Sequence, residues 1–350
     1  MPAEALAASI KQLAGGRALS RAESTAAFDN IMSGEASPAQ IAALLVALRV
    51  KGETADEVAG AASALRRAMV ALPATDPSGL VDTCGTGGGT VPTFNISTAA
   101  ALLAAGMGVR VAKHGNRSFT SACGSADVLE ALGVPIEVPP GDMAAVLEEA
   151  GIVFMFAPLM HPAMRHVGPV RRELAIPTVM NIVGPLANPA NAGRQVIGVA
   201  DRDRMQLLAG ALTHLGTVHA LVVHGEPGMD EISPLGPSQV LEVRDGTIRE
   251  WTIDPAALGV PRVEASDLAG GGPAANAAIV TAVLGGGGPP GARAAVMLNA
   301  AAALYVSGTE PDYATGVTRA AAALDAGEGL RALDRLRAAV ASAARRRSHA

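Results

Sequence analysis

From about residue 80 onward, short apolar runs of strand length alternate with segments of helical periodicity, and this alternation restricts the fold more than any other feature. The expected strands cover 80–84, 109–112, 135–138, 152–157, 195–200 and 218–225. The expected helices begin at Ile96 or cover 126–133, 143–151 and 205–216. Farther along, Asp245-Gly246 separates two alternating runs within 240–253, the pattern of a β-hairpin. The sequence therefore predicts an α/β fold with a mostly parallel sheet and crossover helices.

The first seventy or so residues differ from the rest, because their pattern is helical throughout. Ser20 and Glu23 fit a capping box, in which each side chain accepts a hydrogen bond from the other residue's backbone, and a second such pair starts a later helix. A linker with two prolines and a glycine follows at 71–79. We expect a helical domain at 1–72 and a larger α/β domain at 73–350.

Composition excludes several classes of protein. Hydrophobic residues make up 49% and charged residues 17%, which is typical of a folded globular chain. Only 2% of residues are aromatic and the net charge is −5, which argues against a nucleic-acid partner. No uninterrupted apolar run is long enough for a membrane span, and Cys84 and Cys123 provide neither a disulfide framework nor a zinc cluster. We expect a cytoplasmic protein with no membrane partner.

A glycine-rich loop follows the first expected strand and leads directly into a helix. Gly85, Gly87, Gly88 and Gly89 fall within five residues, and the helix opens at 95–98 with Asn-Ile-Ser-Thr. Glycines let the backbone approach an anion closely, while unpaired N–H groups and the helix dipole face it. The lysine-bearing loop of nucleoside triphosphatases is not present. These local features favour phosphate binding over a structural turn.

A second loop of similar character follows the next expected strand. It contains Lys113-His-Gly-Asn-Arg117 and then a run rich in serine and glycine up to Ser125. In consecutive βα units both loops lie at the carboxyl edge of the sheet, where α/β proteins bind ligands. Each residue alone is equally well explained as a helix cap or a packed loop residue. The two loops together predict one ligand with phosphate groups at both ends.

These motifs resemble the anthranilate phosphoribosyltransferases, the family that joins anthranilate to phosphoribosyl pyrophosphate in tryptophan biosynthesis. The resemblance covers nearly the whole chain and rests on LRVKGET at 48–54, GTGG at 85–88, TFNIST at 93–98, KHGNR at 113–117, GSADVLEALG at 124–133, HPAMRHVGPVRREL at 161–174, NIVGPLANPA at 181–190, MDEIS at 229–233 and NAAAALYV at 299–306. It implies a helical domain, with which 165–190 packs in part, beside an α/β domain of the nucleoside phosphorylase and phosphoribosyltransferase class II type. It also implies a homodimer.

The resemblance assigns roles to individual residues. Phosphoribosyl pyrophosphate would be held by Gly85, Gly88, Gly89, Thr93, Asn95, Ile96, Ser97 and Thr98, and by Lys113, His114, Gly115, Asn116, Arg117, Ser118, Phe119, Thr120, Ser121 and Ser125. Anthranilate would contact Gly85, His114, Asn116 and Arg171. Magnesium, as two ions per subunit, would be bound by Ser97, Asp230 and Glu231.

The chemistry of these residue types agrees with the assignment. Magnesium prefers carboxylates, phosphates and water, and Asp230-Glu231 offer two carboxylates, although such a pair alone would be interpreted as a cap or turn. The fork of Arg171 suits an aromatic carboxylate. An amine on an aromatic ring needs no strong base, so we expect no acid–base residue. Lys113 and magnesium would stabilise the departing pyrophosphate electrostatically.

Two alternatives remain at this point. A pyrimidine nucleoside phosphorylase shares the fold and handles ribose and phosphate, and phosphorolysis of thymidine or uridine would identify it. A non-enzymatic nucleic-acid-binding relative would need a basic surface, which the acidic balance disfavours and a mobility shift would reveal. KHGNR and VRREL favour the transferase, because they supply the site for an aromatic acid.

The chain departs from the family pattern at three places. Gly89 stands where many members have aspartate, and Ala122-Cys123 replaces the more usual lysine-serine. At 175–180 the chain reads AIPTVM where GIRTVF is common. None of these changes removes Lys113, Asn116, Arg171 or the acidic pair.

Overall fold

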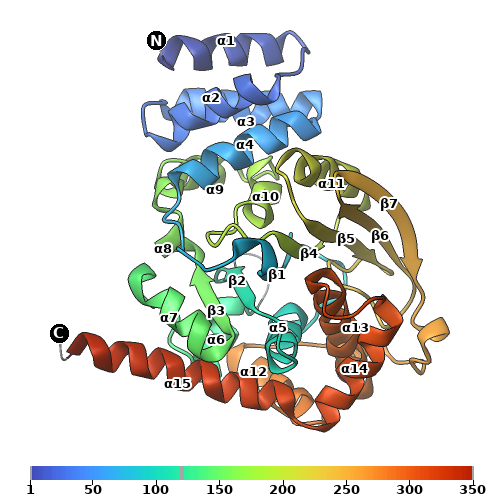
Figure 1. Cartoon of the computed structure of the whole chain (residues 1–350). Helices are drawn as coiled ribbons and strands as arrows, with labels where there is room; N and C mark the ends of the chain where they lie inside the picture. Colours follow the sequence, from blue (N-terminus) through green and yellow to red (C-terminus); the bar gives the residue numbers. More distant parts are fainter. Residues whose placement is uncertain (1, 119–121, 349–350) are drawn as a thin grey trace.

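The centre of the protein is a seven-stranded sheet with the strand order β3-β2-β1-β4-β5-β6-β7 (Figure 1). The computed structural model describes residues 2–118 and 122–348. The strands are β1 (Val81–Gly85), β2 (Val111–Gly115), β3 (Ile152–Phe156), β4 (Arg194–Gly198), β5 (His219–Gly225), β6 (Ser238–Arg244) and β7 (Thr247–Ile253). The strands from β3 to β5 pair in parallel, whereas β6 and β7 add an antiparallel ribbon. This arrangement confirms the predicted α/β fold.

Four helices form the N-terminal part of the chain and lie above the sheet in Figure 1. They are α1 (Pro2–Ala14), α2 (Arg21–Met32), α3 (Pro38–Lys51) and α4 (Ala55–Ala68). The N-terminal ends of α2, α3 and α4 are all closed by capping boxes, two of which the sequence predicts. In each box a Ser or Thr side chain accepts from a backbone N–H, and the partner Glu or Gln accepts from the cap's own N–H.

The remaining helices cover the sheet or join its strands. They are α5 (Ile96–Gly106), α6 (Ser125–Ala131), α7 (Pro140–Ala150), α8 (Ala157–Met160), α9 (Gly168–Leu174), α10 (Met180–Val183), α11 (Met205–His214), α12 (Pro273–Leu284), α13 (Pro290–Ser307), α14 (Tyr313–Asp325) and α15 (Glu328–Ser348). Short 3-10 turns occur at Pro77–Gly79, Pro162–Arg165, Gly184–Leu186, Arg202–Arg204, Ala256–Leu258 and Ala265–Leu268.

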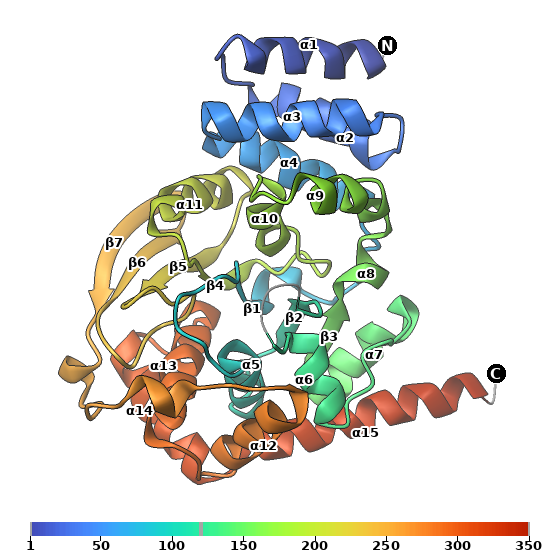
Figure 2. The ribbon, with the colours of Figure 1, turned by 180° about the vertical axis from the view of Figure 1, so that it is seen from behind.

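The sheet separates two hydrophobic cores, and alternate residues along one strand pack into the two cores. On β5, Leu221 and Val223 pack with α5, α13 and α15, whereas Ala220 and Val222 pack on the side of α11 and the N-terminal helices. Buried residues between 163 and 187 belong to this second core, so the segment that contains α9 and α10 packs against the N-terminal helices. Figure 2 shows α9, α10 and α11 between these helices and the sheet.

The predicted strand at 135–138 is wrong, because the structure has irregular chain there. Ile136 and Val138 are buried while Glu137 is exposed, so the alternation that suggested a strand is real. It reflects packing of two apolar side chains into the core without a partner strand. Pro135 and Pro139 flank the run, and prolines have no N–H to donate to a neighbouring strand.

The predicted hairpin is confirmed. β6 and β7 pair in the register Arg244↔Thr247, and the two turn residues have positive φ, 50° at Asp245 and 74° at Gly246. Positive φ at both central positions is the geometry that Asp-Gly favours.

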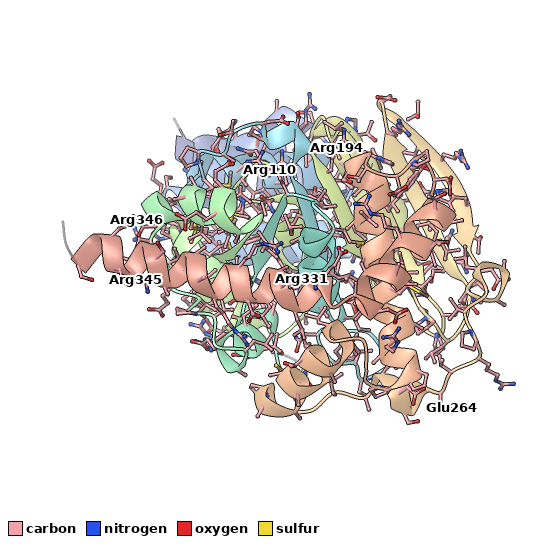
Figure 3. All side chains as sticks on the ribbon, turned by 60° about the horizontal axis from the view of Figure 1, so that its bottom comes forward. Arg110, Arg194, Glu264, Arg331, Arg345 and Arg346 are labelled. Atoms are coloured by element: carbon pink, nitrogen blue, oxygen red, sulfur yellow. The ribbon has the colours of Figure 1, made fainter. Side chains whose placement is uncertain are left out.

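The long helix α15 crosses the lower face of the sheet domain, as Figure 3 shows with Arg345 and Arg346 near its end. Its basic end is tied to α7, because Arg346 Nη1 lies 2.7 Å from Glu149 Oε1 and Arg347 pairs with Asp142. Within residues 2–118 and 122–348, no helix is long and apolar enough to cross a bilayer.

Candidate active site

The glycine loop leaves the carboxyl end of β1 and passes over an acidic side chain. Gly87 and Gly88 have φ of 72° and 84°, values that side chains rarely adopt. The N–H of Gly87 donates to Asp230 Oδ2 at 2.8 Å. A Cβ on Gly85 would lie 2.5 Å from the same carboxylate oxygen, so this position has no room for a side chain. The glycines therefore let the backbone approach Asp230 closely.

The loop ends at the N-terminus of α5, which the residue at its cap position leaves uncapped. The N–H of Ser97 donates to Glu231 Oε1 at 3.0 Å, and Asn95 at the cap position makes no side-chain cap bond. The hydroxyl of Thr98 is buried and has no hydrogen-bond partner in the described part of the chain. An open helix N-terminus with a buried, unsatisfied hydroxyl is suited to an anionic ligand.

The second loop begins where β1 and β2 separate. These strands share one register pair, Val81↔Val111, whereas β1 and β4 share five. Beyond that pair, hydrogen bonds from side chains connect β1 and β2 in place of backbone hydrogen bonds. The N–H of His114 donates to Asp82 Oδ1 at 3.1 Å, and Lys113 Nζ donates to the carbonyl of Thr83 at 2.5 Å. The separation opens the sheet edge at the point from which both loops leave.

Lys113 is a buried cation, since only 3% of the residue is exposed. Its Nζ also lies 3.4 Å from Ser97 Oγ. Burial lowers the pKa of Lys113, and the charges of Asp82 and Glu231 oppose that shift. The ammonium group thus lies near the start of α5, the buried Asp82 and the half-buried Glu231.

The two consecutive acids Asp230 and Glu231 follow β5 after a turn at Gly228, whose φ is 112°. Burial raises the pKa of both, that of Glu231 to about 8, where the neighbouring Asp230 adds to the effect. One buried lysine faces the buried carboxylate of Asp82 and the half-buried carboxylates of Asp230 and Glu231, so a cation would relieve the excess negative charge. Within the described ranges, no three His, Cys, Asp or Glu side chains are grouped to hold a metal ion. A bound cation would therefore take further ligands from phosphate and water.

These features line one cleft of about 460 Å³ at the carboxyl edge of the sheet. The sequence-predicted residues that it brings together are Gly85, Asn95, Ser97, Thr98, Lys113, His114, Gly115, Asn116, Arg117, Ser118, Ser125, Arg171, Asp230 and Glu231. The predicted residues that do not line it are Gly88, Gly89, Thr93 and Ile96. Ile96 instead packs in the core. Phe119, Thr120 and Ser121 lie outside the described residues.

Arg117 and Arg171 have different environments. The guanidinium of Arg117 is paired with Asp127 at 2.9 Å and with Glu130 at 2.5 Å, so its charge is already compensated by two carboxylates of α6. Arg171, from α9, has no ion pair in the described part of the chain and is partly buried, which lowers its pKa. Of the two, Arg171 has the guanidinium that is available to an anionic ligand.

Two imidazoles pack together beside the cleft. The rings of His114 and His161 are 4.9 Å apart between centroids. Burial lowers the pKa of His114 to about 3 and that of His161 to about 4. Both rings are uncharged near neutral pH and are weak bases, so neither is suited to general-base catalysis.

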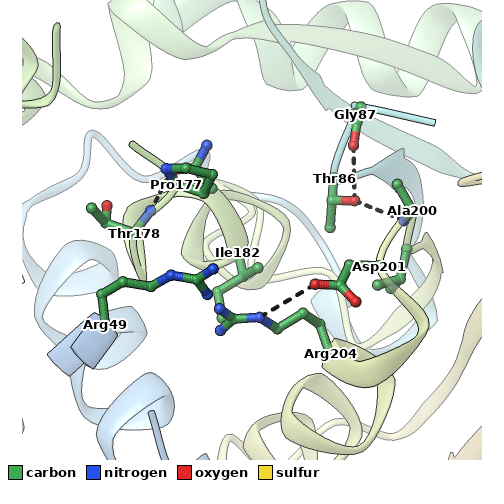
Figure 4. A pocket seen from close by; sticks show the side chains of 12 residues that line it. Arg49, Thr86, Gly87, Pro177, Thr178, Ile182, Ala200, Asp201 and Arg204 are labelled. Carbon is green, nitrogen blue, oxygen red and sulfur yellow. Dashed lines mark hydrogen bonds and ion pairs between the residues drawn. The ribbon is translucent and has the colours of Figure 1, made fainter. Parts of the chain in front are cut away.

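A second cavity of about 390 Å³ adjoins the cleft on the other side of the glycine loop (Figure 4). Gly88 lines this cavity, which extends from the ends of β1 and β4 to Arg49 of α3. Arg204 lies on its wall and reaches the N-terminal helices, where its Nη1 lies 2.7 Å from Glu53 Oε2. The two parts of the chain are thus joined by an ion pair next to the loop.

Sequence reasoning missed several residues of the cleft. Met180 and Asn181 line it without having been predicted to do so, and Thr86 and Gly87 belong to the predicted phosphate loop but had no role of their own. Asp82 is fully buried beneath the cleft and accepts a hydrogen bond from the N–H of His114, which lines it. Asp82 had a detectable signal, because an acid within an apolar strand is costly unless it has a structural or functional partner. Asn181 begins one of the family motifs but had no assigned role, and Met180 had no signal, since both reach the cleft through the path of α10.

Comparison with known proteins covers both parts of the chain. Residues 78–330 match the α/β domain of a glycosyl transferase family, and residues 7–69 match the helical bundle domain of a glycosyl transferase family. The chain is 50% identical over 334 residues to an anthranilate phosphoribosyltransferase of Chloroflexus aggregans, which covers 95% of this chain and 96% of the relative.

Solved structures give the same result. The anthranilate phosphoribosyltransferase of Thermus thermophilus superimposes with a TM-score of 0.89 at 43% identity, over 95% of this chain and 99% of that one. The Saccharomyces cerevisiae enzyme in complex with phosphoribosyl pyrophosphate and magnesium superimposes with a TM-score of 0.87 at 28% identity, over 96% and 98% of the two chains.

Proposed function

Because this chain belongs to the anthranilate phosphoribosyltransferases, we propose that the cleft between its two loops is where that reaction takes place. The chain transfers the 5-phosphoribosyl group of phosphoribosyl pyrophosphate to the amine of anthranilate and releases pyrophosphate, a step of tryptophan biosynthesis. One observation carries the assignment of the site. Segments far apart in the sequence bring Lys113, Asn116, Arg171 and the pair Asp230-Glu231 to a single cleft.

Phosphoribosyl pyrophosphate spans the two loops. The glycine loop and the open end of α5 hold its pyrophosphate, where Lys113 lies 3.4 Å from Ser97 Oγ. The second loop, from Lys113 to Ser125, holds the ribose and the 5-phosphate. This orientation is supported by charge, since the buried ammonium lies next to the helix terminus that accepts the more highly charged group.

Anthranilate lies between Asn116 and Arg171. The guanidinium of Arg171 binds the carboxylate, and the amide of Asn116 orients the amine. The uncharged ring of His114, which packs on that of His161, forms one wall beside the aromatic ring. Proximity supports this assignment, because Asn116, His114 and Arg171 line the same cleft.

Magnesium would be bound by Asp230 and Glu231, with Ser97 next to them. When bound, it neutralises charge on the pyrophosphate as this group leaves. The half-buried carboxylates fit such a role, since desolvation raises the pKa of both and a cation beside them would favour their ionised forms. Magnesium is present in the structure of the yeast relative. The family resemblance supports three further proposals: two magnesium ions per subunit, a homodimer and a cytoplasmic location. Equilibrium dialysis tests the number of ions, sedimentation tests the dimer, and cell fractionation tests the location.

The residues of the cleft act by position and charge. As the bond from ribose to pyrophosphate lengthens, positive charge develops on the ribose and negative charge on the leaving group. Lys113 stabilises the leaving group, and Asn116 and Arg171 hold the amine on the opposite face of the ribose. The pKa values of the two histidines lie too low for either to remove the amine proton effectively near neutral pH.

The test follows the loss of anthranilate fluorescence with purified protein, phosphoribosyl pyrophosphate and magnesium. Arg171→Ala should raise the KM for anthranilate at least about tenfold, because a charge-assisted hydrogen bond is lost. Arg172→Ala is the matched control, since Arg172 is the neighbouring arginine on α9 and does not line the cleft. Equal effects of the two substitutions, or turnover without magnesium, would contradict the assignment.

A further inference from the structure

Asn95 occupies the cap position of α5 but does not cap the helix. Asparagine is among the best N-cap residues, because its side-chain oxygen readily accepts from the second or third N–H of a helix. In α5 those N–H groups belong to Ser97 and Thr98, at the helix end that we assign to the pyrophosphate, and the N–H of Ser97 already donates to Glu231 Oε1. A cap bond from Asn95 would compete with the ligand for the N–H of Thr98.

The side chain of Asn95 is instead held by two other segments. Its Nδ2 donates to the carbonyl of Cys123 at 3.1 Å, and its Oδ1 accepts from Nδ2 of Asn276 at 2.9 Å. Oδ1 of Asn276 in turn accepts from the N–H of Gly271 at 2.7 Å. Backbone groups fix both ends of this relay, a donor at Gly271 and an acceptor at Cys123, so both amides have one orientation.

Asn276 is placed for this contact by the chain that leads into α12. Only 2% of Asn276 is exposed. The same segment lies against the residues before α5, where the N–H of Phe94 donates to the carbonyl of Leu268 at 2.9 Å. A Cβ on Gly270 would lie 2.7 Å from the carbonyl oxygen of Thr93, so the two backbones are in close contact. The segment from 268 to 276 thus braces the end of the glycine loop.

We propose that Asn276 is a positioning residue of the phosphate-binding cleft, an inference that rests on the proposed function. It holds the side chain of Asn95 away from the end of α5, which leaves the N–H of Thr98 to the ligand, while the N–H of Ser97 donates to Glu231. Through Asn95 it also ties the glycine loop to the second loop at Cys123. Neither effect requires Asn276 to touch a substrate.

Two substitutions separate this role from a merely structural one. Asn276→Asp keeps an acceptor for Gly271 but cannot donate to Asn95 when ionised, whereas Asn276→Ala removes both bonds. We expect both to raise the KM for phosphoribosyl pyrophosphate about tenfold and to change the KM for anthranilate less than about twofold. If Asn276 only braced α12, Asn276→Asp would keep the wild-type KM, and that result would overturn the proposal.

A double-substitution cycle tests whether the effect passes through Asn95. Asn95→Ala combined with Asn276→Ala should be no worse than Asn95→Ala alone, whereas additive losses would overturn the proposal. Asn30→Ala is the matched control, because Asn30 is also a buried asparagine, 3% exposed, but lies in α2. It should lower the melting temperature and leave both KM values unchanged.

A binding measurement distinguishes failure of this inference from failure of the proposed function. Pyrophosphate with magnesium should raise the melting temperature of the wild-type protein, and this rise should shrink in both Asn276 variants. An active wild type whose variants retain the full rise would overturn the role of Asn276 alone. A wild type with neither turnover nor a pyrophosphate-induced rise would overturn both proposals.

Discussion

The buried histidine His161 should make the effect of its own replacement depend on pH. Only 5% of the residue is exposed, and burial lowers its pKa from 6.5 to about 4. In the unfolded chain the ring binds a proton when the pH falls below 6.5. In the folded protein it binds one only when the pH falls below about 4. The free energy of unfolding of the wild type therefore decreases as the pH falls from 6.5 towards 4, because the unfolded chain takes up a proton there and the folded protein does not.

The magnitude follows from the width of the window. Each pH unit between the two pKa values costs about 1.4 kcal/mol, so near pH 5, about 1.5 units below the unfolded value, the loss is about 2 kcal/mol. His161→Gln removes the titrating ring. The decrease in unfolding free energy that this substitution causes should thus be about 2 kcal/mol smaller near pH 5 than near pH 7.5. The packing loss is the same at both pH values, so it cancels in this difference.

Urea unfolding of both proteins without ligand at the two pH values measures this difference. Ile31→Val is the control, because Ile31 is fully buried and carries no titratable group, so its cost should be the same at both pH values. A pH-dependent difference below about 0.5 kcal/mol for His161→Gln would refute the reasoning. A ring of His161 that titrates near its unfolded value by NMR would refute it directly.

Two further substitutions test other contacts. Gly198→Ala should abolish anthranilate consumption and destabilise the fold, because its Cβ would overlap the carbonyl oxygen of Asp230. Gly141→Ala is the control and should leave activity unchanged, because the space around its Cβ is open. Wild-type turnover in the first variant would contradict this. Glu53→Ala should cost about 3 kcal/mol in urea unfolding, since it leaves Arg204 without its buried partner. A loss below about 1 kcal/mol would show that the ion pair contributes little.

Local signals in the sequence predict most of the elements. The capping box at Ser20 and Glu23 and the Asp245-Gly246 turn were readable, because each depends on residues within three or four positions of one another. The run at 135–138 shows the limit of such signals. Alternation indicates which side chains are buried, but whether a partner strand lies alongside depends on distant parts of the chain.

The candidate site shows the same division. The two loops could be located from their glycines and polar residues, and their adjacency followed from consecutive βα units. The family resemblance, and not local pattern, directed attention to Arg171 and Asp230. Spacing alone could not show that Asp230 lies within 2.8 Å of the N–H of Gly87, since 143 residues separate them. The supporting contact of Asn276 with Asn95 had no sequence signal for the same reason.

The sequence by itself determined the class of fold, the division between a helical and an α/β part, and the two loops that follow β1 and β2. These follow from side-chain periodicity, helix caps and glycine conformation, all of which act over a few residues. Only the tertiary structure decided that β1 and β2 separate beyond Val81, with Asp82 bridging the gap to His114, and that the glycine loop contacts Asp230. Those features depend on which distant groups share a buried space, and burial is a property of the whole packed chain.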